Sequence, residues 1–197
     1  MLKAKKMGAN HNIKRYGEQW PSYRIEHGLD ILNKLKAWVI ISGGWAWHFM
    51  SPENHTEYKH AHDHKDIDIF VHPKDVSEVM VVLQQQGFKK VWTRYDHMPS
   101  NENFRRYEII DWLNSGKQVR VTIDFFESAT VETITVNGWT VVEPKTLLSY
   151  YSNIHSSDKC WAVKAALKLI AKGKNPVGSV LLSKNPLEKV QKKWKLK

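Results

Sequence analysis

The sequence has little of what a secreted or membrane-spanning protein requires. Of its 197 residues only one is a cysteine, Cys160, so no disulfide can form within the chain. No apolar run approaches the roughly 20 residues that cross a bilayer, and the first residues lack the apolar stretch of a signal peptide. We therefore expect a cytoplasmic protein that does not act on membranes.

Acidic residues are scarce toward the end of the chain. Between Lys159 and Lys197 there are 11 lysines, no arginine and one acid, Glu188, so this segment carries +10 (11 minus 1). The preceding 158 residues are neutral, with 19 basic and 19 acidic residues. A basic terminal segment offers a surface to polyanions such as RNA, but a solvated helix face followed by a lysine-rich tail explains the pattern equally well.

The remaining composition is that of a globular domain. With 42% hydrophobic and 25% charged residues, the chain is long enough to bury a core without disulfides. We expect a catalytic core at 1–157 and a helical, lysine-rich segment at 158–197 that packs on the core or extends from it. Apolar spacing predicts the strands and helices of an α/β (α+β) fold. The expected helices are 23–36, 45–50, 74–86 and 144–151, and the expected strands are 38–41, 66–71, 88–95, 104–113 and 121–126, with a hairpin at 131–144.

Two glycines connect the first predicted strand to a helix. Ser42-Gly43-Gly44 interrupts an apolar, β-branched run, and a helical pattern begins at Trp45. Glycine lets the backbone approach a ligand closely, and the first N–H groups of a helix have no partner within it. This turn therefore predicts a site for a di- or triphosphate.

Three aspartates lie on strands that are otherwise apolar. Asp66 and Asp68 alternate with Ile67 and Ile69, so both project from one face, and Asp124 has a similar setting in Val-Thr-Ile-Asp-Phe-Phe. If the two strands are neighbours, the three carboxylates meet. Such oxygen ligands suit magnesium, and two ions about 3.5–4 Å apart can clamp the attacking and leaving oxygens of a displacement at phosphorus.

Each motif by itself usually has a structural explanation. Gly-Gly is most often a turn, and Asp-x-Asp is most often a solvated strand edge. Their occurrence together and in this order favours chemistry, because inward-pointing carboxylates on apolar strands would repel one another without a cation.

The two motifs resemble those of the nucleotidyltransferase superfamily that includes DNA polymerase beta. The residues concerned are Gly-Gly-Trp-Ala at 43–46 and His-Lys-Asp-Ile-Asp-Ile at 64–69, and they are most similar to the small lincosamide and aminoglycoside nucleotidyltransferases. The resemblance implies that Gly43 and Gly44 hold nucleotide phosphates and that Asp66 and Asp68 bind metal. Asp124 would complete the metal site or accept the proton of the attacking hydroxyl. Further nucleotide contacts are expected from Ser42, His64, Lys145 and Lys159. The resemblance also implies that the predicted strands form a mixed β-sheet flanked by helices.

The function expected is therefore the metal-dependent transfer of a nucleoside monophosphate. The donor would be a nucleoside triphosphate such as ATP, bound with two Mg²⁺ ions, and the acceptor a hydroxyl, with release of pyrophosphate. The lysine-rich segment favours an RNA acceptor, for example a tRNA end, whereas the family resemblance implies a small antibiotic-type molecule. A non-catalytic nucleic-acid-binding module on the same fold is a further alternative.

A histidine-rich stretch separates the two motifs. The segment at 45–65 is longer than the resemblance leads us to expect, and its surplus, residues 51–65, is polar and contains His55, His60, His62 and His64. Imidazoles at this spacing can hold zinc, and a small metal-binding protein is a third reading. The stretch lacks cysteine and the longer-range ligand spacing of structural zinc sites. We therefore expect a surface loop over the active site rather than a zinc centre.

Overall fold

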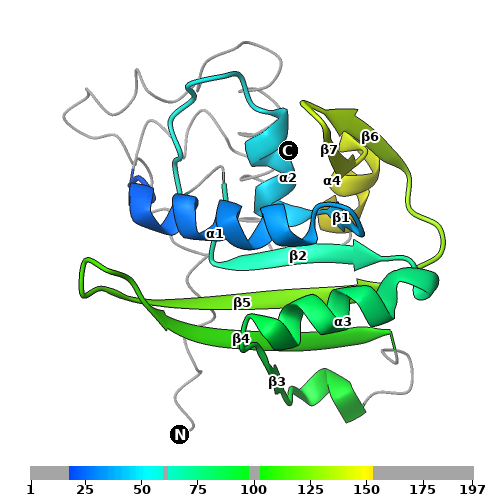
Figure 1. Cartoon of the computed structure of the whole chain (residues 1–197). Coiled ribbons are helices and arrows are strands. Elements are labelled where there is room, and N and C mark those ends of the chain that lie inside the picture. Colours follow the sequence, from blue (N-terminus) through cyan, green and yellow to red (C-terminus); the bar gives the residue numbers. More distant parts are fainter. Residues whose placement is uncertain (1–17, 60–61, 98–102, 153–197) are drawn as a thin grey trace, which may run out of the picture.

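A seven-stranded mixed sheet forms the centre of the molecule (Figure 1). The computed structural model describes residues 18–59, 62–97 and 103–152, and the predicted segment 158–197 lies outside these ranges. The strand order is β3-β4-β5-β2-β1-β7-β6. The strands are β1 (Val39–Ile41), β2 (Asp66–Val71), β3 (Lys89–Val91), β4 (Phe104–Trp112), β5 (Gln118–Glu127), β6 (Thr133–Val136) and β7 (Trp139–Val142).

Helices cover the sheet as the sequence predicts. They are α1 (Ser22–Leu35), α2 (Gly43–Met50), α3 (Val76–Gln85) and α4 (Pro144–Ser152), with 3-10 turns at Pro73–Asp75 and Arg94–His97. Figure 1 shows α1 and α3 in contact across one face of the sheet. The predicted mixed sheet flanked by helices is confirmed. In the described ranges, no helix combines the length and the apolar character that crossing a bilayer demands.

Strand directions bring three chain segments to one edge of the sheet. β1 pairs parallel with β7, with Ile41 opposite Val141, and antiparallel with β2, with Ile41 opposite Ile69. The end of β1, the end of β7 and the start of β2 therefore lie at the same edge. That edge carries the glycine turn and the first residues of α4.

The core lies on the helix-covered face of the sheet. Buried and half-buried positions alternate along β2, and Ile67, Ile69 and Val71 are the buried ones. They share one apolar cluster with residues of the neighbouring strand and of the two covering helices, among them Ile123, Phe125, Leu32, Leu35, Val79 and Leu83. Since alternate side chains of a strand point to opposite faces, Asp66 and Asp68 project from the other face.

Local sequence explains most element boundaries. Asn137 and Gly138 have φ angles of 50° and 76°, which confirms the predicted primed turn between β6 and β7. The predicted strand 88–95 is too long, because it ends at Val91. Asp96 there accepts hydrogen bonds from the backbone N–H and hydroxyl of Thr93, at 2.5 and 2.9 Å, and so favours a turn.

Truncation of a buried apolar side chain should destabilise the fold far more than truncation of an exposed one. Leu32 is fully buried on α1, so Leu32→Ala should lower the free energy of unfolding by about 2–5 kcal/mol through lost burial and a residual cavity. Val81 on α3 is 50% exposed, and Val81→Ala should change it by about 0.5 kcal/mol or less. Urea unfolding followed by circular dichroism measures both. Equal losses in the two variants would contradict the core described here.

Candidate active site

The pairing of β2 with β5 assembles the three predicted carboxylates. The two strands are parallel neighbours, and Asp68 is the direct partner of Asp124, while Asp66 lies opposite Thr122. Side chains of register partners point to the same face, so all three aspartates share the face opposite α1 and α3. Asp124 is only 8% exposed, and the carboxylates of Asp66 and Asp68 are half-buried.

An arginine that the sequence analysis missed neutralises part of this charge. Arg106 on β4 is the register partner of Asp124. It donates from Nε to Oδ1 and from the terminal amino group to Oδ2, both at 2.6 Å. These charge-assisted bonds, together with the nearby charges of Asp66 and Asp68, raise the pKa of Arg106. The strand at 104–113 was predicted, but its register against β5 was needed to find the pair.

The carboxylate of Asp66 is held in an environment that disfavours its negative charge. Burial raises the pKa of its carboxyl, and the charge of Asp124 raises it further, against the opposite effects of Lys65 and Arg106. The Lys65 ammonium is 3.9 Å from Asp66 Oδ2 and is itself half-exposed, so it screens the carboxylate weakly. A partly buried group of like charges of this kind favours a bound cation.

The glycine turn lies directly against the carboxylates. The Ser42 N–H donates to the backbone carbonyl of Asp68 at 2.8 Å. Gly43 has a φ of +58°, and a Cβ added to it would lie 2.0 Å from Asp68 Oδ2. A Cβ on Gly44 would lie 2.1 Å from the carbonyl oxygen of Asp63. Both positions therefore require glycine, and the N-terminus of α2 is in contact with the predicted metal site.

The other predicted nucleotide contacts are placed differently. Lys145 is exposed in the first turn of α4, at the sheet edge that also carries Gly43, because β7 runs parallel to β1. Lys159 lies outside the described residues. His64 is 2% exposed and directs its Nε2 to Glu57 Oε2, at 2.6 Å. The structure thus groups His64 with Glu57.

The histidine-rich loop differs from the expected surface loop. The histidines of the loop that the structure describes, His55, His62 and His64, are half-buried or buried around Glu57, which they and His48 contact. His60 lies outside the described residues. Burial raises the pKa of the Glu57 carboxyl, but hydrogen bonds from His48, His55 and His64 outweigh that effect and hold it far below the usual range. Sequence analysis missed Glu57 because a lone glutamate in a polar loop gives no signal. It also missed His48, which α2 contributes.

Backbone anchors fix where the loop ends and β2 begins. Arg24 on α1 donates to the carbonyl of His64 at 3.1 Å and to that of Lys65 at 2.9 Å. It also donates to the carbonyl of Arg120 on β5, at 3.1 Å. One arginine therefore ties the residues just before Asp66 to the strand that carries Asp124.

Comparisons with known proteins give structural likenesses only. No protein-family model matches the sequence, and no curated protein matches it. An antigenic nucleotidyltransferase-like protein from Paracoccidioides brasiliensis is similar in structure, at 16% identity over 87% of this chain and 89% of that one, with a TM-score of 0.47.

Two further similar structures are antibiotic-modifying enzymes by name. One is the lincosamide antibiotic adenylyltransferase LnuA with lincomycin bound, at 14% identity over 76% of this chain and 99% of that one, TM-score 0.41. The other is ANT(2'')-Ia in complex with adenylyl-2''-tobramycin, at 11% identity over 88% of this chain and 97% of that one, TM-score 0.47. At these identities and TM-scores the likenesses do not decide the function of this chain.

Gly43 provides a test of the close approach between the turn and Asp68. Gly43→Ala should lower the free energy of unfolding by more than Gly116→Ala, by at least ~1 kcal/mol. Both glycines have positive φ, of +58° and +73°, but a Cβ on Gly116 would meet nothing within 4 Å. Both variants would strain the backbone, but only Gly43→Ala would also bring a Cβ against Asp68. The difference between them therefore measures that clash. Equal losses, measured by urea unfolding, would show that the turn does not touch the carboxylate.

Asp66 gives the fold a defined pH dependence. Its pKa in the folded chain is raised above the ordinary 3.8, so the folded state binds the proton more tightly than the unfolded state. At pH values above the raised pKa, ionised Asp66 therefore destabilises the folded state. As the pH falls below that pKa, Asp66 is protonated and the destabilisation disappears. With chelator present, Asp66→Asn should be more stable than wild type at pH 7, and the difference should shrink toward pH 3.8. Thermal unfolding across this range measures it, and a variant less stable at pH 7 would contradict the assignment.

Proposed function

We propose that the chain is a metal-dependent nucleotidyltransferase, which transfers a nucleoside monophosphate from a nucleoside triphosphate to an acceptor hydroxyl. One observation carries the proposal. Three carboxylates from two paired strands meet on one face, and the glycine-opened N-terminus of α2 touches one of them. A metal-binding group and an anion-binding group thus lie side by side, as a metal–triphosphate substrate requires.

The residues present fit magnesium. Asp66, Asp68 and Asp124 supply only oxygen atoms, the ligands that this hard cation prefers. Arg106 contacts Asp124, and the ammonium of Lys65, 3.9 Å from Asp66, screens that carboxylate weakly. We expect the three aspartates to hold the two ions of the mechanism. Such ions, when bound, neutralise the triphosphate and stabilise the charge that develops in the transition state.

The turn before α2 would bind the phosphates. Ser42 is the N-cap residue of α2, and the N–H groups of Gly43 and Gly44 belong to the first turn, whose donors have no partner within a helix. Close approach is possible only because neither residue has a side chain. Lys145, in the first turn of α4 at the same sheet edge, would add a positive charge toward the triphosphate.

Asp124 would receive the proton of the attacking hydroxyl. Arg106 uses one lone pair on each carboxylate oxygen, so each oxygen retains a second one. The hydroxyl oxygen forms a bond to the α-phosphorus while its proton moves to Asp124. The bond from that phosphorus to the bridging oxygen breaks, and pyrophosphate leaves with the electron pair. Arg106 holds the carboxylate in one orientation throughout, as a positioning residue.

The acceptor hydroxyl belongs to one of two classes. The net charge of +10 in residues 159–197 favours RNA, which rests on sequence alone because these residues lie outside the described ranges. The resemblance of the two motifs favours a small hydroxylated molecule. The same assay distinguishes them, because label enters either a macromolecular or a small product.

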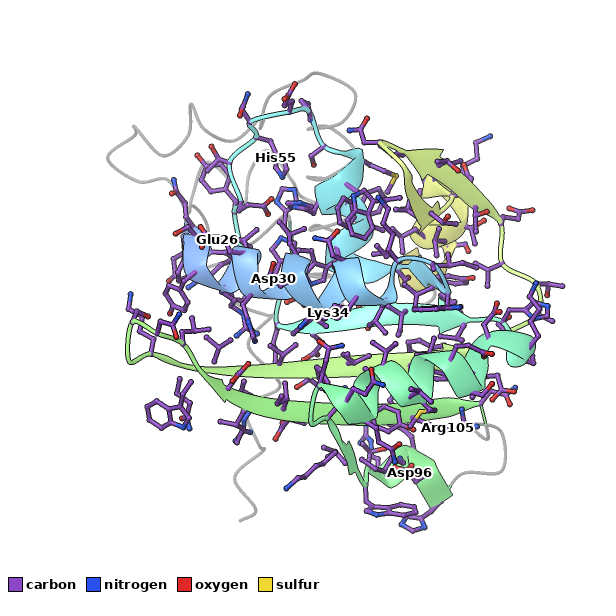
Figure 2. All side chains as sticks on the ribbon, viewed as in Figure 1. Glu26, Asp30, Lys34, His55, Asp96 and Arg105 are labelled. Atoms are coloured by element: carbon purple, nitrogen blue, oxygen red, sulfur yellow. The ribbon has the colours of Figure 1, made fainter. Side chains whose placement is uncertain are left out.

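Substitution of Asp68 tests the chemistry. The purified chain, Mg²⁺ and each α-labelled nucleoside triphosphate are incubated with total cellular RNA or with a panel of hydroxylated small molecules. Asp68→Asn should reduce labelled product at least ~10²-fold, because the ion that stabilises transition-state charge would lose a carboxylate ligand. Asp30→Asn is the matched control, since Asp30 is exposed on α1, which covers the opposite face (Figure 2).

The results of this assay distinguish the two acceptor classes from each other and from a non-catalytic protein. Label in RNA with wild type and the Asp30 variant supports transfer to RNA, and label in a small product supports the other acceptor class. Full activity of Asp68→Asn would overturn the proposed mechanism. Triphosphate that binds without Mg²⁺ and is never turned over would favour the non-catalytic reading.

A further inference from the structure

Four histidines converge on one glutamate beside the proposed active site. Glu57 Oε1 faces His48 Nδ1 and His55 Nε2, the latter at 2.6 Å. Glu57 Oε2 faces His64 Nε2 at 2.6 Å and His62 Nδ1 at 3.7 Å. The side chains of His62 and His64 are fully buried, and that of Glu57 is 14% exposed. Figure 2 shows His55 above α1, on the loop between α2 and β2.

The outer contact of His55 fixes a hydrogen on Nδ1 and directs Nε2 at Glu57. His55 Nδ1 lies 2.9 Å from the carbonyl oxygen of Pro52, which can only accept, so Nδ1 carries the hydrogen. Nε2 faces Glu57 Oε1 at 2.6 Å, and in the neutral ring the lone pair of Nε2 is the one that a metal ion beside Glu57 would take. A backbone carbonyl on the outer nitrogen is the usual arrangement for a histidine that binds metal.

His62 shows the same arrangement through a different partner. The Ser51 hydroxyl donates to the carbonyl of Trp47 at 2.7 Å, so its oxygen accepts from His62 Nε2 at 3.1 Å. His62 Nδ1 is therefore the bare nitrogen. It is buried, lacks a hydrogen-bond partner in the described part of the chain, and faces Glu57 Oε2. A lone pair directed at a buried carboxylate repels it unless a cation lies between them.

The backbone holds this cluster in place. Trp20 donates from its backbone N–H to the carbonyl of Glu57 at 2.8 Å and from its indole N–H to the carbonyl of His62 at 2.5 Å. Gln19 and Tyr58 form an isolated β-bridge. His48 is fixed by α2, and the His64 ring packs on Trp45 with centroids 4.1 Å apart. Ligands from a helix, a loop and the approach to β2 are thus ordered by contacts outside the cluster.

We propose that this cluster is a second metal site, which binds one zinc-class divalent ion through His48, His55 and Glu57. The donor atoms of these three residues all lie within 4.8 Å of one another. Two imidazole nitrogens and a carboxylate oxygen are zinc-type ligands, and a nitrogen-rich set of this kind disfavours magnesium. His62 and His64 line the other side of Glu57. The ion joins α2 to the loop that follows it, and Glu57 links the ion to His64 through its other oxygen.

Metal analysis of the full chain tests the site. Protein purified without a polyhistidine tag is loaded with Zn²⁺ or Co²⁺, passed through a desalting column and analysed for metal. Wild type should retain about one ion per chain, and Co²⁺ should give visible absorption bands of a four-coordinate site. His55→Ala and Glu57→Gln should each lower retention at least ~10-fold. His97→Ala, next to Asp96 at the opposite end of the molecule in Figure 2, should retain the ion.

A second measurement covers the case in which a variant fails to fold. Zn²⁺ that binds only the folded state should raise the thermal midpoint of the wild-type chain, and the same concentration of Mg²⁺ should not. No shift with Zn²⁺ would overturn the proposal and leave a hydrogen-bonded histidine–glutamate cluster. Retention by folded His55→Ala equal to that of wild type would also overturn it, because the ion would then lie on other histidines.

Discussion

The parallel pairing of β2 with β5 is the constraint on which the proposed active site depends. It sets Asp68 opposite Asp124 and thereby brings three carboxylates to one face of strands whose other face is the apolar core. A slip of one residue would move Asp66 and Asp68 into the core and expose Ile67 and Ile69. Burial of these isoleucines therefore enforces the register that creates a cluster of like charges, and the cost of that cluster is what a cation relieves.

The two clusters of ionisable groups differ in chemistry and are linked by one short segment. The carboxylate site offers oxygen atoms beside a helix N-terminus, whereas the Glu57 cluster offers imidazole nitrogens around one carboxylate. α2 begins at the first and contributes His48 to the second. His64 ends the loop two residues before Asp66. An ion at Glu57 would thus hold both the phosphate-binding turn and the first metal-binding aspartate in position.

Local patterns predicted the elements, but not the contacts between distant strands. The apolar spacing of 23–36 gave α1 to within one residue, Asn137-Gly138 gave the hairpin turn, and alternation placed Asp66 and Asp68 on one face. Arg106 was missed because its pairing with Asp124 depends on the β4–β5 register. Glu57 was missed because its partners come from α2 and from both halves of a loop. From its composition alone, a polar, histidine-rich stretch is predicted to be an exposed loop, and only the structure shows that His62 and His64 are buried.

The proposed active site is tested most directly by X-ray diffraction. The crystals are grown with a non-hydrolysable nucleoside triphosphate and with Mn²⁺ in place of Mg²⁺. Anomalous density for Mn²⁺ is expected between Asp66, Asp68, Asp124 and the triphosphate, with the phosphates against the N–H groups of Gly43 and Gly44. A triphosphate bound elsewhere, with no manganese at the three aspartates, would contradict the proposed active site.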